Sequence, residues 1–165
     1  MASVKQLLEW HVKQESLVAA RAAHAQLEKM QGELAQSVAL CEQKAAALVN
    51  PTTPDEEIAQ LLAEQELWLT RKALAQFDDE QEAQLLMLLQ RVQELDFELA
   101  VLGQSLPEKW VEEYYRLAKS KQNPIVEVKG EACTGCFREL SLHNRNEWRR
   151  GKGLVHCDEC GRILV

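Results

Sequence analysis

Four cysteines near the C-terminus are the residues of this chain whose type and spacing point most directly to chemistry. Two residues separate the members of each pair, Cys133 with Cys136 and Cys157 with Cys160, and twenty residues separate the pairs. A tight turn with this spacing aims two thiolates at one ion, and two facing turns complete a tetrahedral zinc site. The pattern predicts one structural Zn²⁺ ion, held by these four cysteines.

A zinc ion with four thiolate ligands has no free position for an activated water molecule, which a catalytic zinc requires. His143 and His156 lie near the cysteines, but a lone histidine there is more often a surface residue or a neighbour of a ligand. Cys41 falls on an apolar helical stripe, as a core residue would. The sequence offers no nucleophile paired with a base and no phosphate-binding loop. We therefore expect no catalytic residues and no enzyme activity.

A basic segment lies between the two cysteine pairs. Asn144 with Glu147 suits the first turn of a short helix there. The candidate nucleic-acid face of this helix consists of Arg145, Trp148, Arg149, Arg150 and Lys152. Residues 107–165 carry 11 Lys and Arg against 9 Asp and Glu, and a zinc–thiolate centre adds a charge of about −2. Two interpretations stay open, a solvated face and a face that contacts RNA or DNA.

Three consecutive acids, Asp55, Glu56 and Glu57, form the remaining candidate contact site. Acidic residues in the first turn of a helix stabilise that turn, which is sufficient to explain them. A coiled-coil hairpin with acids at its tip also resembles in shape the factors that enter the secondary channel of RNA polymerase. In those factors the acids help to hold a catalytic magnesium ion, so a contact role of this tip is the alternative.

Two long helices are predicted to carry this tip. Residues 3–49 contain no proline and one glycine, and they are rich in Ala, Leu, Gln, Glu and Lys, which favour helix. The prolines of residues 50–54 end that helix. Thr53, Pro54 and Glu56 then provide a capping box for a second helix. A connection this short forces the two helices into an antiparallel hairpin.

A heptad repeat predicts the face through which the second helix packs. Apolar residues there alternate at spacings of three and four. They are Leu85, Leu88, Val92, Leu95, Leu99, Leu102 and Leu106. Upstream the same seam meets Asp78 and Gln81, while apolar residues follow another phase, namely Ile58, Leu62, Leu69 and Phe77. We therefore expect a stutter in the repeat near residues 78–84.

The remaining chain connects the hairpin to the cysteines. Gly103 is expected to end the second helix, Ser105 with Glu108 to begin a third, and residues 125–128 to form a strand. The predicted fold is mainly α, a long antiparallel coiled-coil hairpin plus a small C-terminal β zinc ribbon. The predicted domains are the hairpin at residues 1–106 with its tip at about 50–54, a connecting helix and strand at 107–128, and the ribbon at 129–165.

Charge and composition restrict the partners and the compartment. Residues 1–106 carry 8 Lys and Arg against 17 Asp and Glu, so they repel phosphate backbones and leave any nucleic-acid contact to the ribbon. The sequence shows no signal-peptide core and no run of 18 apolar residues. Paired zinc-binding cysteines suit a reducing compartment. We expect a cytoplasmic protein without membrane insertion.

Three segments of the C-terminal part, residues 112–117, 130–136 and 157–164, resemble a known family. The four cysteines and the run from Gly161 to Leu164 carry this resemblance to the bacterial C4-type zinc-ribbon, coiled-coil hairpin family. It covers about residues 107–165 at the level of motifs, whereas the hairpin agrees in architecture alone. In that family a long antiparallel hairpin is followed by the ribbon.

The resemblance implies an adaptor that binds the enhancer-dependent sigma factor, or flagellar or type III secretion components, and an RNA-binding role has also been attached to the family. Our leading hypothesis is a non-enzymatic adaptor whose hairpin binds partner proteins. The alternative is a nucleic-acid-binding or RNA-polymerase-associated transcription regulator. The polar seam residues Lys13, Lys44, Asp78 and Gln81 are either tolerated within one chain or form a docking patch.

Overall fold

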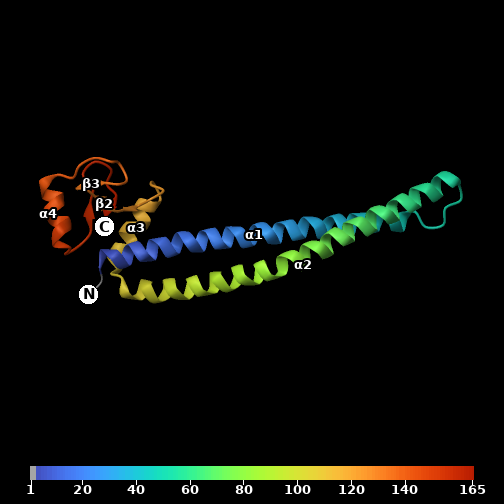
Figure 1. Cartoon of the computed structure of the whole chain (residues 1–165), viewed down its shortest axis with the longest axis horizontal. Coiled ribbons are helices and arrows are strands. Elements are labelled where there is room, and N and C mark those ends of the chain that lie inside the picture. Colours follow the sequence, from blue (N-terminus) through green and yellow to red (C-terminus); the bar gives the residue numbers. More distant parts are fainter. Residues whose placement is uncertain (1–2) are drawn as a thin grey trace. The chain divides into compact units, whose positions relative to one another are not determined.

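The computed structural model describes residues 3–165, so Met1 and Ala2 of the predicted hairpin lie outside the described residues. The elements in chain order are α1 (Val4–Ala47), α2 (Pro54–Ser105), α3 (Glu108–Ala118), β1 (Ile125–Val126), β2 (Val128–Lys129), β3 (Ala132–Cys133), α4 (Leu142–Arg150), β4 (Val155–His156) and β5 (Ile163–Leu164). Figure 1 labels the four helices, β2 and β3. Two long helices followed by a small set of strands confirm the predicted fold class. None of the helices in the described part of the chain combines the length and the apolar composition needed to cross a bilayer.

The chain forms two compact units, which we call the base and the distal hairpin. The base comprises the chain up to Leu17 together with Glu94–Val165, and the distal hairpin comprises Val18–Gln93. Each unit contains a segment of α1 and an antiparallel segment of α2. The predicted domain boundaries follow chain segments rather than these units, and they stay a prediction.

Both long helices begin with a capping box, the one expected at Thr53 and a second one at Ser3. The Ser3 amide donates to Gln6 Oε1 at 2.8 Å, and the Gln6 amide donates to Ser3 Oγ at 3.3 Å. At the start of α2, the Glu56 amide donates to Thr53 Oγ1 at 3.3 Å. The Glu56 carboxylate accepts the amides of Thr52 and Thr53 at 2.6 and 3.2 Å. Both helices therefore begin where local hydrogen bonding predicts.

Three boundaries differ from the sequence-based expectations. Helix α2 continues through Gly103 to Ser105, whose hydroxyl donates to the Leu102 carbonyl at 2.7 Å instead of capping the next helix. Helix α3 follows the extended residue Pro107 and has no side-chain cap. The strand expected at residues 125–128 is split into β1 and β2, because the two halves pair with different partners.

The predicted heptad seam of α2 is confirmed by burial. Leu95, Leu99 and Leu106 are buried in the base, where α1 contributes Leu7 and Leu17. In the distal hairpin the seam is thinner. Its α2 residues Leu85, Leu88 and Val92 are half-buried, and its most buried positions are the smaller Cys41 and Ala63.

The stutter expected near residues 78–84 stays a prediction, and the burial of α2 is compatible with one nearby. The partly buried positions Leu67, Thr70, Leu74, Asp78, Gln81 and Leu85 are spaced three, four, four, three and four residues apart, whereas a strict heptad alternates three and four. Asp78 and Gln81 stay on the half-buried face of α2, and Asp78 accepts a 2.7 Å hydrogen bond from Gln31 of α1. The second apolar phase exists, but Ile58, Leu62 and Leu69 face solvent rather than α1. Its fourth residue, Phe77, is half-buried. The bond to Gln31 therefore satisfies Asp78 within the seam.

The polar seam residues Lys13 and Lys44 also have partners in the facing helix. Lys13 Nζ lies 2.7 Å from Glu98 Oε2, and Lys44 Nζ lies 3.4 Å from Glu66 Oε1. Exposed pairs of this kind contribute little stability, but they satisfy the cations within the chain. For Lys13, Lys44 and Asp78, tolerance within one chain explains the polar seam without a docking patch.

Aromatic side chains of α1 and α3 pack in the base. The Trp10 ring meets the Tyr114 ring edge to face, with centroids 4.9 Å apart. The buried His11 Nδ1 lies 2.8 Å from the Tyr114 hydroxyl oxygen, and His11 Nε2 lies 3.5 Å from Glu15. Burial raises the pKa of Tyr114 to about 12, so this hydroxyl keeps its proton at neutral pH. The compatible tautomer has Nδ1 accepting that proton and Nε2–H directed at Glu15.

Burial lowers the pKa of His11 below its ordinary value of 6.5, against the opposing charge of Glu15. In the unfolded chain His11 therefore becomes protonated near pH 6.5, whereas in the folded chain it stays neutral until the pH is lower. This contribution to stability is present above pH 6.5 and is lost as the pH falls below it. We expect stability to decline between pH 7.5 and 5.5, with His11 contributing up to about 1.4 kcal/mol per pH unit.

Denaturant unfolding across this pH range, with His11→Asn beside the wild type, measures that contribution. Asparagine keeps an acceptor near the Nδ1 position but does not titrate, so the variant should show a shallower decline. His24→Asn is the matched control, because His24 of α1 is also close to a glutamate, Glu28 at 3.3 Å, but is more exposed than His11. Equal slopes for His11→Asn and the wild type would contradict the assignment.

Candidate metal centre

Two short sheets position the four cysteines in the base. Strand β5 lies between β1, with which it pairs in parallel, and β4, with which it is antiparallel. Strands β2 and β3 form a separate hairpin, in which Cys133 pairs with Val128. Cys157 follows β4 directly, and Cys160 precedes β5 by two residues. Both cysteine pairs are therefore attached to strand ends.

The four sulfur atoms are arranged as a single metal site requires. All four lie within 4.8 Å of one another, and they form the only cluster of this kind among residues 3–165. The Sγ atoms of Cys133 and Cys160 are 3.7 Å apart, as are those of Cys136 and Cys157. A tetrahedron with zinc–sulfur distances of about 2.3 Å has edges of about 3.8 Å. The residues present therefore fit one structural zinc ion, as predicted.

The thiols of this cluster differ in acidity. Burial raises the pKa of Cys133 to about 12. Burial also acts on Cys160, but hydrogen bonds from Arg162 and from the neighbouring thiols overcome it and lower the pKa of Cys160 to about 7. Cys160 is therefore the readiest thiolate, whereas a metal must displace a proton from Cys133. Zinc affinity should consequently rise with pH.

A small hydrophobic cluster surrounds the site. Val126, Leu140 and Leu164 are buried together with Cys133 and Cys157. Trp148 of α4, which the sequence placed on the candidate nucleic-acid face, is half-buried and packs against this cluster. A ribbon of this size buries too little apolar surface to fold alone, so metal binding supplies a large part of its stability.

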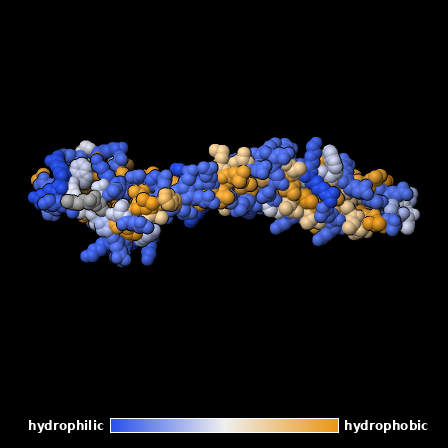
Figure 2. All heavy atoms as spheres, turned by 90° about the horizontal axis from the view of Figure 1, so that it is seen from below, coloured by the Kyte–Doolittle hydropathy of each residue, from blue (hydrophilic) through white to orange (hydrophobic). Residues whose placement is uncertain are grey.

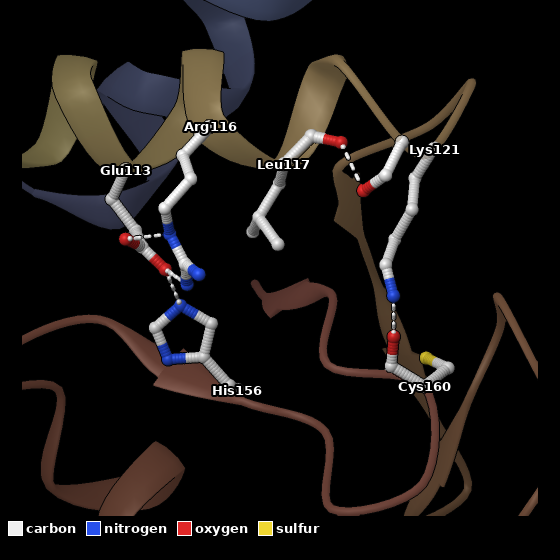
Figure 3. Close-up of polar contacts among 7 residues, drawn as sticks. Glu113, Arg116, Leu117, Lys121, His156 and Cys160 are labelled. Atoms are coloured by element: carbon white, nitrogen blue, oxygen red, sulfur yellow. Dashed lines mark hydrogen bonds and ion pairs between the residues drawn. The ribbon is translucent and has the colours of Figure 1, made fainter.

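Polar contacts join α3 to the ribbon, as Figure 3 shows. Glu113 accepts a 2.8 Å hydrogen bond from Arg116 Nε, and His156 Nε2 lies 3.0 Å from its other oxygen. The hydrogen-bonded Arg116 holds the pKa of Glu113 below its usual range. Lys121 donates to the backbone carbonyl of Cys160. The contacts of Glu113 with His156 and of Lys121 with Cys160 each span about forty residues of sequence, and no local signal marks them.

The two histidines considered as substitute ligands do not belong to the sulfur cluster. His156 is engaged by Glu113, and His143 is exposed on α4. Helix α4 also begins earlier than expected. Ser141 rather than Asn144 is its cap, since Ser141 Oγ accepts the Asn144 amide at 3.2 Å. The Asn144 side chain is buried and donates to the His156 carbonyl at 2.6 Å.

The candidate nucleic-acid face is largely neutralised by acids of the ribbon. Arg145 and Arg149 both pair with Glu131, the second at 2.6 Å, and Arg150 pairs with Glu147 at 2.7 Å. Lys152 is exposed. These pairs weaken the positive potential that a phosphate backbone would meet. The face stays a prediction.

The acidic tip lies in the distal hairpin, and all three of its acids are exposed. Glu56 is directed back at its own turn, and the amide of Thr52, first among its hydrogen-bond donors, lowers the pKa of Glu56. Asp55 and Glu57 flank it in the first turn of α2. The geometry of Glu56 agrees with a capping role, and a contact role for the tip stays a prediction.

The two cysteine turns have the same backbone form but different residues at one position. Gly161 follows Cys160 with φ of 68°, and Phe137 follows Cys136 with φ of 60°. The Gly161 amide donates to the Cys157 carbonyl at 2.8 Å, and the Phe137 amide donates to the Cys133 carbonyl at 2.7 Å. Left-handed backbone is unfavourable for a residue with a side chain. The Phe137 ring is 83% exposed, so packing does not offset this strain.

We expect Phe137→Gly to leave the stability of the zinc-loaded protein unchanged, or to raise it by up to about 1 kcal/mol by relieving the strain. Removing a buried phenylalanine would instead cost about 3–5 kcal/mol. Gly161→Ala is the matched control, and it should destabilise by about 1 kcal/mol because it introduces the same strain. Denaturant unfolding followed by near-UV circular dichroism measures both. A loss above about 1 kcal/mol for Phe137→Gly would show that the ring packs.

Zinc removal should unfold the ribbon but leave much of the circular dichroism signal of the helices. Structural zinc contributes about 10–16 kcal/mol to folding in small zinc-finger peptides, whereas α1 and α2 hold their own capping and seam contacts. After addition of a chelator, the amide NMR signals of residues 129–165 should therefore lose their chemical-shift dispersion, while most of the helical circular dichroism remains.

Metal analysis tests the ligand set. The wild type should contain one zinc ion per chain, and Cys133→Ser with Cys157→Ser should contain none. Cys41→Ser is the matched control, since Cys41 is buried in the distal hairpin, apart from the cluster. Loss of zinc from Cys41→Ser, or its retention by the double variant, would refute the site.

Comparisons with known proteins identify the ribbon. The sequence profile of the C4-type zinc ribbon domain matches residues 132–164. A comparison with curated proteins gives no match.

Solved structures similar to this chain come from several bacteria. The CT398 protein from Chlamydia trachomatis is 18% identical, with a TM-score of 0.46 over 98% of this chain and 81% of that one. The HP0958 protein from Helicobacter pylori is 20% identical, with a TM-score of 0.38 over 97% and 83%. A protein from Mycobacterium smegmatis is 15% identical, with a TM-score of 0.45 over 97% and 83%. The profile match and the sulfur cluster together identify residues 132–164 as a C4-type zinc ribbon.

Proposed function

We propose that this protein is a non-enzymatic adaptor that binds partner proteins through its helical hairpin. The observation that carries the proposal is the amount of apolar surface that the two long helices leave open. Figure 2 shows hydrophobic side chains exposed among polar ones. Contiguous exposed apolar surface on a folded protein typically marks an interaction site.

The metal site supports the non-enzymatic part of this proposal. Four thiolates at tetrahedral spacing fill the coordination sphere of a zinc ion and leave no position for a reacting water. In this role the ribbon stabilises the base through α3, using the contacts of Glu113 and Lys121. The protein would work in a reducing cytosol, where its thiolates stay available to the metal.

The family resemblance suggests the first partners to test. They are the enhancer-dependent sigma factor and components of flagellar or type III secretion systems. The polar seam residues Lys13, Lys44 and Asp78 already have hydrogen-bond or ion-pair partners within the chain. Binding energy for a partner would therefore come from the exposed apolar side chains rather than from unpaired seam charges.

One observation favours the alternative, a nucleic-acid-binding or polymerase-associated regulator. A pocket of about 450 Å³ in the base is lined by Trp148 together with the cations Lys5 and Arg149. An aromatic ring beside cations suits a base and its phosphate. Arg149 is already paired with Glu131, however, so the adaptor remains the better supported proposal.

Affinity capture from cell lysate with the full-length, zinc-loaded protein distinguishes the two proposals. Washes at low and high salt, with and without nuclease, separate protein partners from nucleic acid. We expect specific proteins that survive nuclease and are retained by an Arg149→Gln, Lys152→Gln variant. Recovery of salt-sensitive RNA or DNA alone, lost in that variant, would replace the adaptor with the nucleic-acid binder.

A further inference from the structure

Helix α2 carries a second apolar face within the distal hairpin. Five large side chains between the tip and residue 70 are each 52% to 66% exposed. We call them the outer stripe: Ile58, Leu61, Leu62, Trp68 and Leu69. At about 100° per residue they fall within one third of the helix circumference, an arc as wide as the buried face of an amphipathic helix.

The hairpin itself does not use this face. The opposite side of α2 is the one that packs against α1, where Ala63 is 8% exposed and Leu67 is half-buried. On the same side Thr70 Oγ1 lies 3.7 Å from Cys41 Sγ of α1. The sequence thus places mostly small side chains against α1 and large ones in water. Formation of the hairpin does not explain the outer stripe.

A single exposed apolar residue is ordinary, but five large ones within one third of the helix circumference are not, although Gln65 and Lys72 share that arc. Trp68 lies within the outer stripe, with Lys72 Nζ 5.1 Å above its ring. Tryptophan is the residue type most enriched among those that dominate binding energy at protein interfaces. The outer stripe therefore has the composition of a binding surface for another apolar face.

Charge identifies the kind of partner. Asp55 and Glu66 flank the outer stripe on one side and Glu57 and Glu64 on the other, by the same helical spacing. No Lys or Arg occurs between Lys44 and Arg71. Glu66 is paired with Lys44, so Asp55 on one edge and Glu57 and Glu64 on the other are the acids that attract cations. A second copy of this chain would place acids against acids, which disfavours self-association through this surface.

We propose that the outer stripe binds an amphipathic helix of a partner protein, one that carries Lys or Arg beside its own apolar face. This inference rests on the proposed adaptor function and specifies where and what the hairpin binds. The mode is helix-to-helix packing, in which apolar residues at i, i+3, i+4 and i+7 supply affinity. The acidic flanks supply orientation and exclude acidic helices.

The test uses a defined probe, a fluorescent 18-residue helical peptide with a leucine stripe flanked by lysines. Its binding to the full-length, zinc-loaded protein is measured by fluorescence anisotropy. A second peptide has the same leucine stripe with glutamates in place of the lysines. We expect the lysine peptide to bind the wild type at least about tenfold more tightly than the glutamate peptide.

Two double variants locate the site. The Leu61→Gln, Trp68→Gln variant removes two large apolar side chains from the outer stripe. It should bind the lysine peptide at least about tenfold more weakly than the wild type does. Leu86→Gln with Met87→Gln is the matched control, because both residues are 61% or more exposed on α2 but lie about 27 Å beyond Trp68. The control should bind as the wild type does. Circular dichroism and zinc content must be unchanged in both.

If the wild type and the Leu61→Gln, Trp68→Gln variant bind the lysine peptide with equal affinity, the inference is overturned. It is also overturned if the Leu86→Gln, Met87→Gln control loses as much affinity as the stripe variant. Dimerisation in sedimentation that the stripe variant alone abolishes would assign the surface to a second copy and overturn it as well. Lysate capture separates this failure from that of the adaptor proposal. If the stripe variant recovers the same proteins as the wild type, the adaptor function stands and the outer stripe is not its site.

Discussion

The bond between one metal ion and four thiolates is the interaction on which the base of this protein depends. The strands of the ribbon are two residues long, and their buried cluster is a handful of side chains. Such a segment cannot offset the entropy of ordering its loops without a metal. The segment that presents Cys157 and Cys160 also contacts α3 and the residue Lys121 that follows it, through His156 and through the carbonyl of Cys160. Zinc therefore orders a docking site for α3 as well as its own turns.

The helical part is stabilised differently in its two units. In the base, leucines and the Trp10–Tyr114 pair form a packed seam. In the distal hairpin, that seam is narrow and mixed with polar bonds such as Gln31 with Asp78. Small and polar residues suffice there because the two helices need only to stay adjacent. The larger apolar side chains of the same segment are left on the outside, where they can contact another molecule.

Sequence reasoning succeeded wherever the determining interaction is local. Each of the two cysteine pairs, and the capping box at Thr53, involves residues within four positions of one another. It failed where two local choices compete. Ser141 and Asn144 are both good cap residues, and the choice depends on the Asn144 side chain reaching the distant His156 carbonyl. Gly103 similarly stays helical, because tertiary context can override a weak preference to end a helix.

The outer stripe shows the same limit more sharply. The periodicity of residues 58–69 correctly indicates a second apolar phase, but periodicity alone does not say which of two faces meets α1. Only the position of α1 decides that Ala63 is covered and Trp68 is open. This arrangement has an energetic consequence, since the distal seam buries few large side chains and the outer stripe is left more than half exposed. A partner that binds only the folded hairpin would stabilise it by mass action, so partner binding and hairpin order would increase together.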